Sequence, residues 1–333
     1  MADVTGWEPD VLPGYWQQQL PLGADPDGEG ELVATLVSRG RPQPRATRAV
    51  LVVHGYTDYF FHTALADHLA GRGFAVYAMD LPKCGRSRRA GQTPHFTSDL
   101  AHYDSALQAA LTAVDAEQVL MYGHSAGGLI LSLWLDRLRR RDDTGPITGL
   151  VLNSPFLDLH GPAVLRTPPT SAALMALARV RKMTVVRKPG VGGYGTTLHR
   201  DFAGEFDYNL DWKPVGGFPI TFGWINAIRR GQKRLHRGLD IGVPSLILRS
   251  DHSVAEVSDP DLIQRGDAVL DVDQIARWAG CIGNRLTVVP ITDAKHDVFL
   301  SLPEPRAAAY RELDTWLDWY LTSGTTSTAP DAG

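Results

Sequence analysis

Five consecutive residues, Gly123-His124-Ser125-Ala126-Gly127, fit the pattern G-x-S-x-G and could hold a nucleophile. A serine hydroxyl attacks a carbonyl carbon efficiently only when a neighbouring base takes its proton. In this pattern the serine stands on a tight, strained turn between a strand and a helix, and the glycines leave room for that turn. The pattern is short enough to arise by chance, so the surrounding sequence must decide its meaning.

The residues on either side of Ser125 are those that such a turn requires. The apolar run 118–122 enters the turn as a strand, and residues 126–140 leave it with the spacing of a helix. That helix would point its positive N-terminal end at the serine. The sequence therefore predicts that Ser125 is the nucleophile of an acyl-transfer site.

His296 is the predicted general base. It follows the last apolar run of the chain, 286–290, and it is the only histidine after His252. A base that arrives late in the chain, after a serine and an acid, is one of the known orders for a triad of this kind.

The acid of the triad, which holds the imidazole in one tautomer, has several candidates. Asp251 directly follows the apolar run 245–248, and Asp267 lies later in the same connection. Asp271 precedes a helix expected from Val272 to Cys281 and could cap it. We favour Asp267 because it stands about four residues before that helix, and Asp251 is the main alternative.

Two backbone N–H groups are predicted to stabilise the oxyanion that forms during acyl transfer. One belongs to Tyr56, in the segment His54-Gly55-Tyr56 that follows the apolar run 49–53, and the other belongs to Ala126. His54 is then expected to support the loop. This chemistry requires neither a metal ion nor an organic cofactor.

The elements that must position these residues alternate regularly. Helical spacing separates short apolar runs, at 49–53, 74–79, 118–122, 147–152, 245–248 and 286–290. A last helix is expected from about Pro305 to Leu321. Apolar strands that alternate with helices are typical of an α/β fold, in which helices cover both faces of a mostly parallel sheet.

The alternation stops between residues 153 and 240, which are rich in glycine, proline and aromatic residues. We expect this segment to be a cap or lid inserted into a core formed by 1–152 and 241–322. Residues 323–333 have the composition of a disordered tail. The basic stretch 224–237 is expected to be a helix with a solvated face.

Composition excludes several classes of protein. The chain is 44% hydrophobic and 21% charged with a formal net charge of −4, which gives no reason to expect a nucleic-acid partner. Residues 1–30 do not form a signal peptide, and no apolar stretch is long enough for integral membrane association. Cys84 and Cys281 have no metal-binding spacing, so we expect reduced thiols and a cytoplasmic protein of unknown oligomeric state.

Together these residues resemble the α/β-hydrolase superfamily, and more narrowly the serine aminopeptidase S33 and monoacylglycerol lipase-like group. The resemblance rests on His54-Gly55-Tyr56, on 123–128, on 294–297 and on 80–87. The last stretch is similar to the group's D-x-x-G-x-G-x-S turn, although Lys83-Cys84 stand where that group usually has Gly-His.

The resemblance implies a serine hydrolase that cleaves carboxylic esters through an acyl-enzyme. The small-molecule substrate would carry an apolar acyl group, as a monoacylglycerol does, and His124, Trp212, Phe218 and Trp224 are expected to contact it. The same triad could serve an acyltransferase, a cyclase or a peptidase, and a ligand-binding protein without catalysis is a further alternative.

Overall fold

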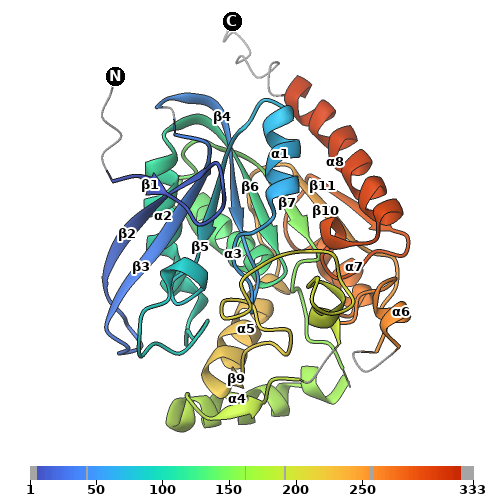
Figure 1. Ribbon diagram of the computed structural model, residues 1–333. Helices are drawn as coiled ribbons and strands as arrows, with labels where there is room; N and C mark the ends of the chain where they lie inside the picture. The colour runs from blue at the N-terminus through green and yellow to red at the C-terminus, as the bar shows by residue number, and fades with distance from the viewer. Residues whose placement is uncertain (1–5, 43, 162, 191–192, 256–258, 324–333) are drawn as a thin grey trace, which may run out of the picture.

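The apolar runs of the sequence form neighbouring strands of one sheet, which in the described part of the chain has the order β1-β2-β3-β5-β4-β6-β7-β10-β11 (Figure 1). The computed structural model describes residues 6–42, 44–161, 163–190, 193–255 and 259–323. The strands predicted from the sequence all pair in parallel: β4 (Ala46–Val53), β5 (Ala75–Asp80), β6 (Ala116–His124), β7 (Ile147–Asn153), β10 (Ser245–Ser250) and β11 (Leu286–Ile291). The prediction of a mostly parallel α/β sheet is confirmed.

The sheet begins with strands that the apolar pattern does not predict. They are β1 (Glu8–Pro9), β2 (Tyr15–Ala24) and β3 (Glu31–Arg39), and they pair antiparallel with one another and with β5. In β2, Pro21 and Gly23 flank an irregularity in the register. A strand near the sheet edge tolerates both residue types, which would disrupt a central strand.

Helices cover both faces of the sheet because alternate side chains of its strands enter two separate cores (Figure 1). In β4, Leu51 and Val53 contribute to one core, while Val50 and Val52 contribute to the other. The first core is covered by α2 (Asp104–Val114), α3 (Ala126–Arg140) and α7 (Val272–Ala279), and the second by α1 (Thr63–Gly71) and α8 (Pro303–Ser323).

The segment 153–240 stands between β7 and β10, which are neighbours in the sheet. In Figure 1 much of it lies at the lower end of the molecule. It holds α4 (Pro168–Arg181), a small antiparallel pair of β8 (Val185–Arg187) and β9 (Ile220–Thr221), and α5 (Phe222–Leu235). Strands of two and three residues are too short to produce a periodic pattern, so the sequence gives no sign of them.

Shorter elements complete the connections. They are η1 (Gly85–Ser87), η2 (Leu100–Tyr103), η3 (Ala163–Arg166), η4 (Tyr194–Thr197), α6 (Pro260–Ile263) and η5 (Val298–Leu300).

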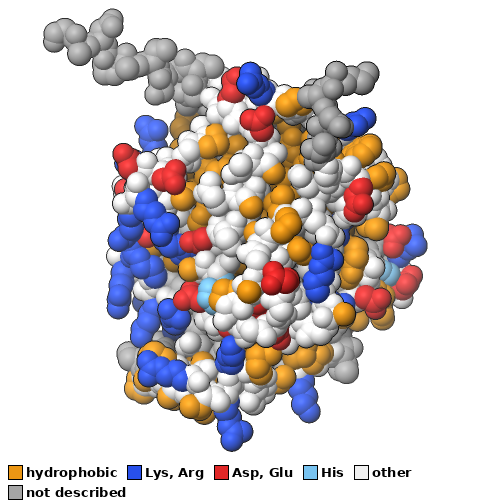
Figure 2. Space-filling model, turned by 90° about the vertical axis from the view of Figure 1, so that its left-hand side faces the viewer, with side chains coloured by type: hydrophobic (Ala, Val, Ile, Leu, Met, Phe, Trp, Pro, Cys, Tyr) orange, Lys and Arg blue, Asp and Glu red, His pale blue; other side chains and the backbone are white. Residues whose placement is uncertain are grey.

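The segment 153–240 exposes large apolar side chains around α4 and β8. Figure 2 shows hydrophobic side chains along the lower edge of one face, at the end of the molecule where this segment lies. Its exposed large apolar residues are Val164, Leu177, Val180, Met183, Val185, Val186 and Phe202.

Two further expectations can be compared with the described residues. None of the helices described here combines the length and the apolar character needed to cross a bilayer. Cys84 and Cys281 are both free thiols in the structure. Of the predicted tail, Ser323 ends α8, and residues 324–333 lie outside the described residues.

Candidate active site

Ser125 occupies the turn between β6 and α3 in a strained conformation, with φ 51° and ψ −118°. The close approach of neighbouring backbone explains the glycines around it. A Cβ on Gly123 would lie 2.8 Å from the Cα of Gly128, and a Cβ on Gly127 would lie 2.6 Å from the carbonyl oxygen of Val53. A non-glycine residue held at positive φ outside a regular element is costly and is concentrated at functional sites.

His296 and Asp267 meet beside this turn, although they come from separate loops after β11 and β10. The Nδ1 atom of His296 lies 2.9 Å from Oδ2 of Asp267, and both side chains are buried. The other carboxylate oxygen of Asp267 accepts hydrogen bonds from the N–H groups of Val269 and Leu270, at 2.8 and 2.7 Å. This arrangement fixes the carboxylate and leaves Nε2 of His296 for another partner.

The predicted nucleophile and the predicted base both lie next to His124. The rings of His124 and His296 have centroids 4.9 Å apart, and Ser125 directly follows His124 in the chain. Within the described part of the chain, the Ser125 hydroxyl has no hydrogen-bond partner. Hydrogen bonds between catalytic groups are often long without substrate and tighten when it binds.

The alternative acid, Asp251, points elsewhere. It pairs with His252 at 2.7 Å and accepts a hydrogen bond from the N–H group of Asp293 at 3.2 Å. These three residues are the described group whose side-chain ligand atoms, all within 4.8 Å of one another, could hold a metal ion. Asp271 caps α7 by accepting hydrogen bonds from its first turn, as expected.

The segment after β4 lies directly against Ser125. A Cβ on Gly55 would stand 3.0 Å from the Cβ of Ser125, which is closer than most contacts of a real Cβ atom, so glycine gives the tightest approach here. Among the residues that the structure describes, the N–H groups of Tyr56 and Ala126 have no acceptor. His54 supports the loop, since its Nδ1 lies 2.7 Å from the Gly55 oxygen and its Nε2 accepts from the Leu81 N–H group at 3.0 Å.

The same two residues line a small cavity. Tyr56 and Ala126 line one side of it, and Trp224 and Ile228 of α5 line another. The Tyr56 and Trp224 rings pack with centroids 4.0 Å apart. The structure therefore brings one of the predicted substrate contacts, Trp224, next to the predicted oxyanion donors.

The other predicted substrate contacts lie at different distances from this cavity. Phe218 packs against His95, which lines the cavity, with ring centroids 5.3 Å apart. Trp212 packs against Tyr59, with ring centroids 5.1 Å apart, and lies under the Arg86 guanidinium. It is not among the residues that line either of the two cavities described here.

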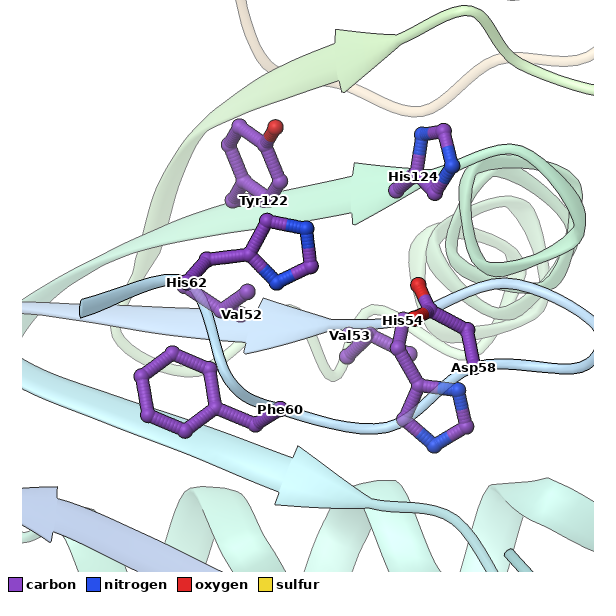
Figure 3. Close-up of a pocket in the computed structure, with 8 residues that line it drawn as sticks. All are labelled: Val52, Val53, His54, Asp58, Phe60, His62, Tyr122 and His124. Carbon is purple, nitrogen blue, oxygen red and sulfur yellow. The ribbon is translucent and has the colours of Figure 1, made fainter. Parts of the chain in front are cut away.

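His124, the remaining predicted contact, lines a second small cavity behind the site. Figure 3 shows His124 on β6 and His62 and Asp58 on the loop after β4, all around the same space. The Nδ1 atom of His124 lies 3.1 Å from the oxygen of Asn153. Burial lowers the pKa of His124 to about 4, so its ring is neutral at ordinary pH.

Asp297, next to the predicted base, anchors a buried network that sequence patterns do not indicate. His62 Nε2 lies 2.9 Å from its Oδ2 atom, and the Asn153 amide donates to its Oδ1 atom at 2.7 Å. Burial alone would raise the pKa of Asp297, but the adjacent His124, His62 and Asn153 outweigh burial and lower it. The network fixes the backbone that carries His296.

The segment 153–240 also contacts the predicted base. The Tyr194 ring packs edge-on against His296 with centroids 5.6 Å apart, and its hydroxyl accepts a hydrogen bond from the Asp297 N–H group at 3.1 Å. Ser125 itself is only 8% exposed. Tyr194 lies in a glycine-rich stretch with no motif that would have identified it.

The sequence matches a known protein family. The family model described as serine aminopeptidase, S33, matches residues 44–260. No curated protein matches the sequence.

Several solved structures share the fold. A soluble variant of monoglyceride lipase from Saccharomyces cerevisiae has a TM-score of 0.62 and 19% identity, over 91% of this chain and 96% of that one. The monoacylglycerol lipase of Paleococcus ferrophilus has a TM-score of 0.62 and 21% identity, over 87% and 99%. A putative aryl esterase from Burkholderia cenocepacia has a TM-score of 0.52 and 18% identity, over 92% and 100%.

Proposed function

The chain belongs to the serine aminopeptidase S33 family, and from this premise we propose that it is a serine hydrolase that cleaves carboxylic esters. The observation that carries the proposal is the pairing of His296 with a fixed, buried carboxylate, Asp267, beside a serine on a strained turn. Acid, base and nucleophile in this arrangement are suited to two-step acyl transfer.

In the first step, His296 takes the proton of Ser125 as the serine oxygen attacks the ester carbonyl carbon. The negative charge that develops on the carbonyl oxygen is stabilised by the N–H groups of Tyr56 and Ala126. Asp267 keeps the proton of His296 on Nδ1 and stabilises the imidazolium. His296 then protonates the leaving alcohol, which departs and leaves an acyl group on Ser125.

In the second step, water replaces the alcohol. His296 takes a proton from the water as the water oxygen attacks the acyl-enzyme, and the same two N–H groups stabilise the second oxyanion. The proton then returns to Ser125, and the free acid leaves. These steps are carried out by side chains and backbone of this chain.

We propose that the segment 153–240 is a cap that covers the site and that Trp224 contributes to an apolar substrate pocket. Tyr194 on His296 and Trp224 on Tyr56 support this role, because both aromatic rings cover catalytic groups. Apolar acyl esters, including monoacylglycerol-like esters, fit a pocket of this character, and monoglyceride lipases are among the proteins of similar fold.

Labelling with a fluorophosphonate, followed by turnover of a p-nitrophenyl ester, tests the proposal. The wild-type protein should be labelled on Ser125 and should release free acid. Ser125→Ala should lose labelling and at least about a thousandfold of kcat, because the acyl-enzyme cannot form. Ser132→Ala is the matched control, since that buried hydroxyl donates to the Gly128 oxygen within α3.

Two results would contradict the proposal. The first is turnover by Ser125→Ala at the wild-type rate. The second is labelling of wild-type Ser125 without release of free acid from any ester, which would favour an acyltransferase, a cyclase or a peptidase. A protein that is neither labelled nor active would instead point to a ligand-binding role.

A further inference from the structure

The cavity beside the oxyanion donors contains a polar atom that the catalytic steps do not use. His95 is 2% exposed, lines this cavity and has no hydrogen-bond partner on Nε2. An unpaired polar atom in a buried site is unfavourable unless something bonds to it. The surrounding rings of Tyr56 and Phe218, with centroids at 5.1 and 5.3 Å, hold the His95 ring in place.

His95 also has a strained backbone that keeps it in this position. Its φ is 58°, and its N–H group donates to the oxygen of Lys83 at 3.1 Å. Lys83 is itself buried and forms ion pairs with Asp25 and Glu29 at 2.6 and 2.8 Å. Strain of this kind persists only where the surrounding structure fixes the residue, and it is concentrated at ligand sites.

The other ring nitrogen of His95 is occupied by Cys84. Nδ1 lies 3.1 Å from the Cys84 sulfur, which also lies 3.4 Å from the oxygen of Pro82. Burial raises the pKa of the Cys84 thiol and lowers the pKa of His95, so both are neutral. Depending on which group holds the shared proton, Nε2 is either a donor or an acceptor.

A second polar group lines the same cavity. Tyr103, on η2, is 5% exposed, and its hydroxyl has no hydrogen-bond partner in the described parts of the chain. The remaining lining side chains beyond the oxyanion loop are mostly apolar: Leu81, Leu100, Ile130, Trp224 and Ile228. Apart from the oxyanion loop and the Trp224 indole, His95 and Tyr103 are therefore the lining residues that carry a polar side-chain group in the described part of the chain.

The position of the cavity indicates which part of a substrate would enter it. It adjoins Tyr56 and Ala126, whereas His296, which would protonate the leaving alcohol, does not line it. The acyl side of an ester would therefore point into the cavity. A hydroxyl group can both donate and accept, so it can bond to His95 in either tautomer and to Tyr103.

We propose that this site selects esters whose acyl group carries a hydroxyl near the carbonyl, with His95 and Tyr103 as the residues that bind this hydroxyl. The proposal rests on the proposed esterase function and narrows its substrate class. A site built to bond to a hydroxyl discriminates against the analogue without one, because the buried polar groups of the protein are then left unpaired.

A pair of matched esters tests this selectivity. For the wild-type enzyme, kcat/KM for p-nitrophenyl 3-hydroxybutanoate should exceed that for p-nitrophenyl butanoate by about tenfold, with 2- and 4-hydroxy esters as further arms. Tyr103→Phe and His95→Phe should each reduce this ratio to about one third of its wild-type value or less. Tyr310→Phe on α8 is the control and should keep the wild-type ratio.

Tyr103→Phe removes one oxygen and keeps the ring, so it tests the proposal even if His95→Phe fails to fold. An equal or higher kcat/KM for the unsubstituted ester than for every hydroxy ester would overturn the proposal. So would a wild-type ratio in both Tyr103→Phe and a folded His95→Phe.

A binding measurement separates this proposal from the esterase function. In Ser125→Ala protein, methyl 3-hydroxybutanoate should raise Tm more than methyl butanoate does at equal concentration. Adding Tyr103→Phe to this protein should remove the difference. If wild-type protein hydrolyses no ester but this difference is present, the esterase function fails and the binding site stands. Equal shifts from the two ligands would contradict the binding site.

Discussion

At the scale of single residues, Asp267 and Asp251 differ in the property that a triad acid needs, which is a fixed contact with the imidazole. Asp267 is fully buried and is held by two backbone N–H groups while it bonds to His296. Asp251 is exposed and pairs with His252. We therefore expect Asp267→Asn to lower kcat by about 10⁴-fold, since an amide favours the wrong tautomer.

Asp251→Asn is the matched control for this substitution, and its kcat should stay within about twofold of wild type, the size expected of a change away from the reacting groups. Steady-state kinetics with one p-nitrophenyl ester measure both variants. If the large loss occurred in Asp251→Asn and not in Asp267→Asn, the assignment of the acid would be wrong.

Asp297 stabilises the protein in a pH-dependent way. Its pKa is lower in the folded state than in the unfolded chain, where an aspartate titrates near 3.9. The stabilisation is therefore complete above about pH 4 and is lost as the pH falls below that value. We expect Asp297→Asn to lower the free energy of unfolding at pH 7 by about 1–3 kcal/mol.

The difference between Asp297→Asn and wild type should shrink as the pH falls from 5 to 3, and urea unfolding across this range measures it. Glu304→Gln, which changes an exposed carboxylate at the start of α8, should follow the wild-type curve. A difference for Asp297→Asn that is constant with pH would show that Asp297 contributes packing and not charge.

At the scale of elements, the loop after β4 is tied to the segment 153–240. The Tyr56 hydroxyl donates to the oxygen of Pro219 at 2.6 Å, and the Thr57 hydroxyl accepts from the N–H group of Phe218 at 2.9 Å. The Tyr59 hydroxyl accepts a hydrogen bond from the backbone N–H group of Asn209 at 2.7 Å. The position of this segment and the position of the Tyr56 N–H group are therefore coupled.

Tyr56→Phe should lower kcat about tenfold with a change in KM of less than about threefold, because the freed loop would misplace the proposed oxyanion donor, which acts mainly in the transition state. The ring contact with Trp224 is kept in this variant. Tyr310→Phe is again the control, and the Tm of both variants is measured alongside kcat and KM. Unchanged kcat in Tyr56→Phe would mean that the tether does not position the donor.

The strands and helices differ in how well the sequence predicts their positions. The parallel strands were predictable because strands buried on both faces need continuous apolar runs. Strand β2 was not, since Gln17, Gln18 and Gln19 hide its alternation. Helix α5 was expected at 224–237 with a solvated face and spans Phe222–Leu235, but Arg229 and Gln232 are buried in it.

The candidate site shows the same division. Ser125 and His296 could be proposed from local context, because a tight turn and a late loop leave a signal within a few residues. The network of His62, Asn153 and Asp297 could not, since its hydrogen bonds join positions 144 and 235 residues apart. Only the tertiary fold brings such residues together.

At the scale of the whole molecule, a buried ion pair joins the segment 153–240 to the loop after β4. Lys213 Nζ lies 2.8 Å from Asp58 Oδ1, and both residues are buried. Burial alone would raise the pKa of Asp58, but Lys213, followed by neighbouring histidines, lowers it below the ordinary value. The buried Asp58 side chain is therefore kept ionised mainly by Lys213, which belongs to the segment 153–240.

Lys213→Met should lower the free energy of unfolding by about 3–5 kcal/mol, because it leaves the Asp58 charge buried without its partner. Adding Asp58→Asn should restore most of this loss, since the cost comes from the unpaired charge. Arg200→Ala, which breaks the exposed pair with Asp207, should cost less than about 1 kcal/mol. Urea unfolding followed by two probes measures all three variants.

The ion pair also predicts how the molecule unfolds. If Lys213 and Asp58 bind the segment 153–240 to the core, near-ultraviolet and far-ultraviolet signals of the wild-type protein should change in one transition. Lys213→Met should move that transition as a whole to lower urea concentration. Two separate transitions in the wild-type protein, with only one of them shifted by Lys213→Met, would mean instead that the segment unfolds on its own and that the buried pair stabilises only the segment.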